Sequence, residues 1–258
     1  MSVAAPPIFD THCHLGQFQD GDPVAEHARA AAAGVVRLLV VGIDAKTSAQ
    51  AQALAPLPGV GWSAGLHPND ALRLGDDWPA IAALARQPGC LAIGETGLDT
   101  FRDRCPLPQQ ELSLRTHLAL ARELDLPVIL HCRDAYAPLY DVLRELPPHR
   151  GVMHCFSGTL ADARTALDLG LLLSFAGPLT YPKNDALRQV AAFAPADRIL
   201  VETDAPFLPP QSHRGKRNEP ALIVATVQAL AQTRQIPFAA AAERTFANAS
   251  RLFDRAGR

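Results

Sequence analysis

The stretch Pro7-Ile8-Phe9-Asp10-Thr11-His12-Cys13-His14-Leu15-Gly16 contains the first apolar run of the chain, followed directly by two histidines. On a β-strand the side chains i and i+2 point the same way, so His12 and His14 can present two imidazoles to one point. An open, doubly wound sheet normally carries a glycine-rich phosphate turn after its first strand, and this stretch has no such turn. The stretch therefore favours another α/β fold, with the doubly wound sheet as the alternative.

Short runs rich in β-branched residues or leucine alternate along the chain with alanine-rich amphipathic runs. Strict alternation predicts a parallel sheet, and eight such units in 258 residues predict a closed (β/α)8 TIM barrel. We expect residues 1–258 to form a single domain. The expected strands cover residues 7–10, 36–42, 60–65, 90–95, 128–132, 151–155, 171–175 and 199–202, and the expected helices cover residues 22–33, 46–55, 77–87, 108–124, 135–145, 160–169, 184–193, 219–234 and 237–253.

Composition and charge narrow the class of protein. Hydrophobic residues make up 48% of the chain, enough for a large core, and a formal net charge of -2 gives no global basic character, so a DNA substrate would need local contacts. The five scattered cysteines argue against a disulfide framework. The sequence shows no signal peptide and no apolar run long enough to cross a membrane, which predicts a cytoplasmic protein. We expect a monomer, because no extra apolar surface segment is evident.

Histidines and carboxylates stand where the expected strands end. In (β/α)8 enzymes the active site is built at the C-terminal ends of the strands. Six of the eight expected strands deliver such a residue there, and five of the nine histidines in the chain are among them. The residues at these ends are His12, His14, His67, Glu95, His131, His154, Glu202 and Asp204.

Imidazole and carboxylate groups suit zinc, manganese and similar ions. Two neighbouring ions need a bridging ligand, and the two oxygens of Glu95 make it the natural candidate. We predict that His12, His14, Glu95 and Asp204 hold one ion, and that Glu95, His131 and His154 hold the other. The expected cofactors are two divalent ions, with zinc, manganese and magnesium as the alternatives.

The motifs that contain these residues resemble the TatD family of metal-dependent deoxyribonucleases, which belongs to the amidohydrolase-type barrels. The resemblance implies a (β/α)8 barrel, a divalent metal centre formed by the same six residues, and hydrolysis of phosphodiester bonds, with exonucleolytic action implied by the family alone. The motifs run through the chain as Phe9-Asp10-Thr11-His12-Cys13-His14-Leu15, Gly65-Leu66-His67-Pro68, Ile93-Gly94-Glu95-Thr96-Gly97-Leu98-Asp99, Gln109-Gln110, Leu126-Pro127-Val128-Ile129-Leu130-His131-Cys132-Arg133-Asp134-Ala135, His154-Cys155-Phe156-Ser157-Gly158, Val201-Glu202-Thr203-Asp204-Ala205-Pro206 and Arg214-Gly215-Lys216-Arg217-Asn218-Glu219-Pro220.

The chain departs from the family pattern at Gly16, Asn69 and Thr100, where the family usually has an acidic residue, a histidine and an aromatic residue. None of these positions is a proposed ligand, but all three should lie at the mouth of the site. They leave open a metal-dependent ester or amide hydrolase, such as a D-aminoacyl-tRNA deacylase. A nucleic-acid-binding module with a degenerate site is a third hypothesis, which the complete ligand set disfavours.

Catalytic roles can be assigned to four side chains of this set. Asp204 could bind metal and accept a proton from the attacking water. Glu95 would bridge the ions. Glu202 would orient a histidine or bind metal-linked water, or serve as a buried structural acid paired with an arginine or lysine. His67 could contact phosphate or donate a proton, or serve only as a polar cap.

Basic residues near the expected site are candidates for substrate binding. Arg133 could clamp a phosphate or pair with a neighbouring carboxylate. Arg214 and Lys216 lie in a loop that could contact DNA or be merely solvated. Cys13, Cys132 and Cys155 each adjoin a candidate ligand, and strand periodicity predicts that they face the surrounding helices as small buried side chains.

Overall fold

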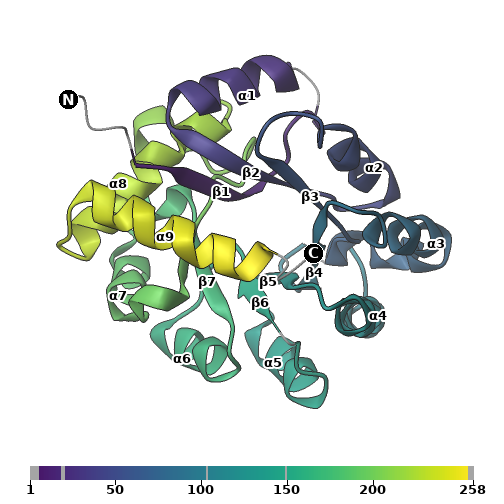
Figure 1. Cartoon of the computed structure of the whole chain (residues 1–258). Coiled ribbons are helices and arrows are strands. Elements are labelled where there is room, and N and C mark those ends of the chain that lie inside the picture. The colour runs from purple at the N-terminus through teal and green to yellow at the C-terminus, as the bar shows by residue number, and fades with distance from the viewer. Residues whose placement is uncertain (1–5, 19–20, 103, 149, 255–258) are drawn as a thin grey trace.

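Eight parallel strands form the centre of this computed structural model, counted within the described residues 6–18, 21–102, 104–148 and 150–254. They pair in chain order, and Figure 1 shows the helices arranged around them. An isolated bridge between Cys13 and Ala205 connects the first strand to the segment that follows the last. The predicted (β/α)8 barrel is confirmed. Its strands are β1 (Ile8–Cys13), β2 (Val35–Val41), β3 (Val60–Ala64), β4 (Cys90–Asp99), β5 (Val128–Arg133), β6 (Gly151–Met153), β7 (Leu172–Phe175) and β8 (Ile199–Val201).

Every predicted helix is present, with shifts at some ends. The strand β4 continues to Asp99 rather than ending at Glu95, and α8 starts at Ile223 rather than Glu219 because the 3-10 turn η5 (Pro220–Leu222) precedes it. No helix in the described part of the chain is both long and apolar enough to span a membrane. The helices are α1 (Pro23–Ala32), α2 (Ala45–Ala53), α3 (Leu74–Ala85), α4 (Leu107–Leu124), α5 (Tyr136–Glu145), α6 (Leu160–Asp168), α7 (Asp185–Phe193), α8 (Ile223–Thr233) and α9 (Phe238–Phe253).

Apolar side chains fill the barrel below its C-terminal end. These side chains form one hydrophobic cluster. The last helix, α9, closes the N-terminal end of the barrel by packing Leu252 and Phe253 against the cluster, and Figure 1 shows the helix lying across the barrel. The rings of Phe9 and Phe253 lie 5.9 Å apart. With one end sealed, the polar residues gather at the opposite mouth. The strand residues of the cluster are Phe9, Leu39, Val41, Ala92, Ile129, Val152, Leu172 and Leu200.

Hydrogen bonds from side chains and backbone complete the junction of β1 and β8. The buried carboxylate of Asp10 accepts hydrogen bonds from the backbone N–H (2.9 Å) and hydroxyl (2.6 Å) of Thr203. The N–H of Asp204 donates to the carbonyl of His12 at 2.9 Å. These bonds fix the segment that follows β8 beside the end of β1, so that Asp204 lies next to the two histidines of β1.

Candidate metal centre

The close approach of β4 and β5 places Glu95 beside His131. Gly97 of β4 pairs with His131 of β5 and has a φ of +145°, a conformation that L side chains rarely adopt. A Cβ atom at Gly97 would collide with the carbonyl oxygen of His131. Glycine is therefore required at this position for the two strands to carry their polar side chains to one point.

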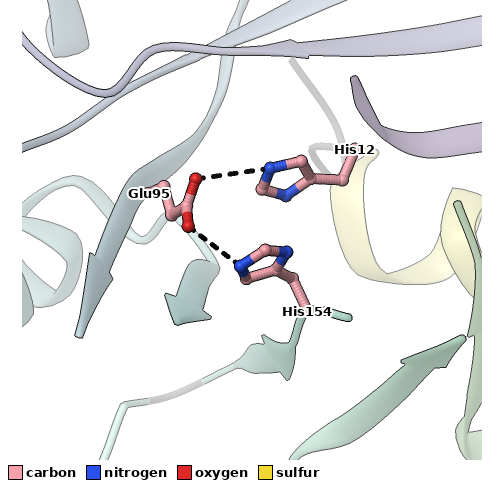
Figure 2. Close-up of side chains that lie close together, drawn as sticks. All are labelled: His12, Glu95 and His154. Carbon is pink, nitrogen blue, oxygen red and sulfur yellow. Dashed lines mark ion pairs between the residues drawn. The ribbon is translucent and has the colours of Figure 1, made fainter. Parts of the chain in front are cut away.

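The carboxylate of Glu95 lies between two groups of imidazoles. Its Oε2 atom is 3.4 Å from Nε2 of His12 and 3.8 Å from Nε2 of His14. Its Oε1 atom is 2.9 Å from both Nδ1 of His131 and Nε2 of His154. Figure 2 shows the two oxygens directed toward His12 and His154, as a carboxylate that bridges two ions requires.

Asp204 joins the group on the β1 side. Its Oδ1 atom lies 3.7 Å from Nε2 of His12 and 3.6 Å from Nε2 of His14, and the two histidine nitrogens are 3.3 Å apart. The structure thus brings all six predicted ligands together around Glu95, and His154 groups with His12 as well as with His131. How they divide between two ions stays a prediction. Their role as ligands remains a prediction.

Three of the histidines are oriented by an acceptor behind them. The Nδ1–H of His14 can donate to the carbonyl of Val41 (3.0 Å), and the Nδ1–H of His154 can donate to Glu202 (3.3 Å). His131 is reversed, because its Nε2 atom faces Asp99 at 3.2 Å and its Nδ1 atom faces Glu95. In each case the outer hydrogen bond places the proton outward and leaves a lone pair directed into the centre.

Asp99 has an orienting role that the sequence reading did not assign, although a motif contains it. Its carboxylate also accepts the amide Nδ2–H of Asn69 (3.3 Å) and the backbone N–H of Phe101 (2.9 Å) and of Arg102 (3.0 Å). Glu95 and Asp99 are four residues apart on one strand, so the strand period could have placed both on the same face.

The carboxylates of the centre are ionised and its histidine rings are closely packed, as expected of a site that binds cations. Burial raises the pKa of a carboxyl group, yet the adjacent histidines, His154 foremost, hold the pKa of Glu95 well below its usual value. The pKa of Asp204 is lowered against the same burial by its contact with His14. The stacked rings of His12 and His154 have centroids 4.0 Å apart, a poor arrangement for two imidazolium ions.

Buried atoms without partners complete the fit. Within the described residues, Nδ1 of His12 and Oε2 of Glu202 have no hydrogen-bond partner. Burying such atoms unpaired is costly. Because Nε2 of His12 faces Glu95, an ion held there would leave Nδ1 in need of water, and water on a bound ion would suit Oε2 of Glu202. The nitrogen and oxygen donors match the ligand types of zinc and manganese.

His67 lies at the edge of the same cluster. Its Nδ1 atom accepts the N–H of Asn69 (3.1 Å), and its Nε2 atom is 3.5 Å from Oε1 of Glu95. Burial lowers the pKa of His67 to about 3, so the ring is neutral and carries its proton on Nε2, toward the centre. His67, Glu95 and His131 also form a third group of close ligand atoms.

The predicted substrate-binding residues lie outside the ligand cluster. Among the described residues, Arg133 forms no ion pair, and its guanidinium lies 3.6 Å from the ring centroid of Phe101. Arg214 is stacked over Tyr181 at 4.3 Å, and the side chain of Lys216 is exposed. The salt bridge considered for Arg133 is thus replaced by a contact with an aromatic face.

The structure separates the three cysteines that adjoin candidate ligands. Cys13 and Cys132 are in the hydrophobic core, as predicted, and the thiol of Cys13 faces the carbonyl of Leu39 at 3.6 Å. The prediction of burial was wrong for Cys155, which is partly exposed. The reason is that β6 ends at Met153, so strand periodicity does not extend to Cys155, whose φ is +42°.

The departures from the family pattern have defined contacts. Asn69 bonds to Asp99, as described above, and the hydroxyl of Thr100 donates to the carbonyl of Asp134 at 2.7 Å. Gly16 has a φ of +69° in the loop after β1. Two of the three substitutions therefore take part in the hydrogen bonding around the loop that follows β4.

Comparisons with known proteins show what the chain is similar to in sequence and in fold. The family model described as TatD related DNase matches residues 9–254. An uncharacterized metal-dependent hydrolase, YabD of Bacillus subtilis, is 37% identical, over 95% of this chain and 98% of the relative. A 3'-5' ssDNA/RNA exonuclease TatD of Erwinia tasmaniensis is 38% identical, over 96% of this chain and 100% of the relative. The crystal structure of the TatD homologue YJJV from Escherichia coli superposes with a TM-score of 0.87 at 33% identity, over 96% and 98% of the two chains.

Proposed function

The chain belongs to the TatD related DNase family of metal-dependent hydrolases, and we propose that it is an exonuclease that removes nucleotides from the 3′ end of single-stranded DNA or RNA. The observation that carries the proposal is the position of Glu95, which offers one oxygen to His12 and His14 and the other to His131 and His154. The relatives named as exonucleases support the substrate class. The alternative of an aminoacyl-tRNA deacylase finds no such support among them.

In this proposal two divalent ions occupy the centre. His12, His14, Glu95 and Asp204 would hold one, and Glu95, His131 and His154 would hold the other. Bound ions of this kind neutralise charge on a phosphoryl group and lower the pKa of water to near 7. Zinc, manganese and magnesium remain the candidate ions.

The protein residues position the substrate and move protons. Asp204, at the side of the centre nearest the β8 loop, accepts the proton of the attacking water. His67, neutral and protonated on Nε2, offers a hydrogen bond to a phosphoryl oxygen. Glu202 holds His154 through Nδ1 and also accepts the N–H of Cys155 at 2.7 Å, which fixes the carboxylate. Arg133, Arg214 and Lys216 would contact phosphates along the strand.

The test is a comparison of substrates with the metal removed and restored. The protein is stripped with a chelator, reloaded with Mg²⁺, Mn²⁺ or Zn²⁺, and assayed on single-stranded DNA, double-stranded DNA, RNA and aminoacyl-tRNA. Release of mononucleotides from single strands should depend on metal and disappear in Glu95→Ala, while the control Glu123→Ala, whose side chain is exposed on α4, keeps it. Activity on the aminoacyl ester alone would contradict the proposal.

The proposal also includes a single domain over residues 1–258, a monomeric state and a cytoplasmic location, as expected from the sequence. One unbroken eight-stranded sheet, which takes strands from Ile8 to Val201, supports the single domain. Light scattering on a size-exclusion column would check the monomer.

A further inference from the structure

Exposed phenylalanines border the metal centre. Among the described residues, three phenylalanine side chains are more than a third exposed: Phe101 (57%), Phe193 (43%) and Phe207 (46%). Single exposed apolar residues are common on proteins, so exposure alone indicates little. The position is informative, because Phe101 is two residues past the end of β4 and Phe207 lies in the loop after β8, whereas Phe193 is at the end of α7. The loops after β4 and β8 both follow residues of the metal centre.

Phe207 is held rigidly beside the β1 side of the centre. Its backbone N–H donates to the carbonyl of Asp204 at 2.8 Å, and its own carbonyl accepts the side-chain amide of the buried Asn218 at 2.6 Å. The ring of Phe18 meets it at 5.1 Å and 70°, and the ring of His14 at 5.9 Å. An aromatic surface that is half exposed is thus fixed in relation to two candidate ligands.

The opposite side of the mouth has different chemistry. The strands β4 and β8 lie across the barrel from each other in the eight-membered order. There the ring of Phe101 is covered by the guanidinium of Arg133, whose N–H groups have no hydrogen-bond or ion-pair partner among the described residues. Stacking leaves the edge of a guanidinium free to bind a phosphate. The Arg133 side therefore suits phosphate, and the Phe207 side suits an uncharged planar group.

We propose that Phe207, supported by Phe18, is a stacking surface for a nucleobase that adjoins the scissile phosphate. The inference rests on the proposed exonuclease function and adds the group that selects unpaired nucleotides. Every base has a π-face, so stacking on phenylalanine tolerates any sequence, but a base within a duplex has both faces covered by its neighbours. Phe207 would thereby favour single-stranded ends without reading sequence.

The binding test uses the metal-loaded protein and short single strands with phosphorothioate linkages that resist cleavage. One strand carries normal bases, and two others carry an abasic residue at the last or the second-last position of the 3′ end. Fluorescence anisotropy gives Kd for each. The wild type should bind the normal strand about 5- to 150-fold more tightly than at least one abasic strand, the range that corresponds to about 1–3 kcal/mol per stacked base.

The variants separate stacking from packing. Phe207→Ala and Phe207→Leu should both bring the ratio of the two Kd values close to 1, because leucine keeps apolar bulk but lacks a π-face, and Phe207→Trp should retain the preference. Phe193→Ala, an equally exposed phenylalanine with Arg164 over its ring at 5.2 Å, is the matched control and should behave as wild type.

One result would overturn the inference: an unchanged ratio of the two Kd values in Phe207→Ala and Phe207→Leu, whether both affinities stay the same or both fall equally. A failure of the proposed function is distinguishable, because the wild type would then cleave no single strand with any metal. Cleavage by the wild type together with full activity and full base preference in Phe207→Leu would reject the stacking surface alone.

Discussion

Replacement of Asp99 by asparagine is expected to weaken metal binding on the His131 side of the centre while the fold is retained. The carboxylate oxygen Oδ1 of Asp99 accepts the backbone N–H groups of Phe101 and Arg102, and Oδ2 faces Nε2 of His131 at 3.2 Å. Asparagine keeps an oxygen for the two backbone donors, so its NH₂ group must replace Oδ2. His131 then has to accept at Nε2, which moves its proton to Nδ1, the atom that faces Glu95 at 2.9 Å.

The inverted tautomer removes the lone pair that an ion would need. Loss of an outer partner of a metal-binding histidine typically costs 10- to 100-fold in affinity or activity, or about 1.4–2.7 kcal/mol. Asn69 loses its acceptor at the same time, since its NH₂ group would meet the NH₂ group of the new residue. We expect the free energy of unfolding of the metal-free variant to drop by about 1–2 kcal/mol, because the hydrogen bond from Asn69 is lost and that with His131 is reversed, while both backbone bonds remain.

The assay is a competition titration of zinc against a chromophoric chelator, with total metal measured by mass spectrometry. In Asp99→Asn one of the two binding steps should weaken, while the step assigned to His12, His14 and Asp204 remains. Asp197→Asn is the control, because its carboxylate is 69% exposed in the 3-10 turn η3 (Ala196–Arg198), just before β8. Two unchanged binding steps in Asp99→Asn would refute the assignment of Nδ1 of His131 as a ligand atom.

Three further outcomes follow from individual contacts. Cys13→Ala should keep its full metal content by mass spectrometry, because the thiol faces the carbonyl of Leu39 in the core; stoichiometric loss would overturn the ligand set. Burial lowers the pKa of His117 to about 4 in the folded protein. Between about pH 6.5 and pH 4 the unfolded chain therefore binds a proton there that the folded protein does not, and the free energy of unfolding decreases as the pH is lowered. Between pH 7 and pH 4, urea unfolding of the metal-free protein should show about 3 kcal/mol more loss for wild type than for His117→Gln; equal losses would contradict this. Arg214→Ala combined with Lys216→Ala should reduce the slope of log K against log salt for single-stranded DNA by about 1.4, at about 0.7 per phosphate contact; an unchanged slope would place the two residues outside the substrate site.

The barrel could be predicted from the sequence because each of its signals is local. Alternation of β-branched and alanine-rich runs needs only neighbours along the chain, and histidines or carboxylates mark the ends of the six strands that carry the candidate site. Closure was predicted from the number of strand–helix units, but the contacts that join the two ends of the sheet were not. One of them is Asp10, which accepts two hydrogen bonds from Thr203, a residue 193 positions away. The position of α9 over the closed end of the barrel could not be predicted either, because an amphipathic pattern does not indicate which surface a helix packs against.

The grouping of the candidate ligands was predictable, and their orientation was not. His12 and His14 have the strand spacing that directs both inward, and their grouping with Asp204 follows from the adjacency of the first and last strands in a barrel. The reversed ring of His131 depends on Asp99, which contributes no predicted ligand atom. Strand periodicity also failed for Cys155, because a three-residue strand ends before it.

Each half of the centre is joined to one exposed phenylalanine through a single acidic residue. On the β4 side, Asp99 orients His131 and accepts the backbone N–H of Phe101, which in turn packs against Arg133. On the β8 side, the carbonyl of Asp204 accepts the N–H of Phe207. The side chains of Phe101 and Phe207 are therefore positioned by hydrogen bonds to acidic residues of the centre, and not only by the loops in which they lie. A phosphate placed by the ions would meet an arginine on one side and an aromatic face on the other, and this asymmetry would give a single strand one preferred direction across the site.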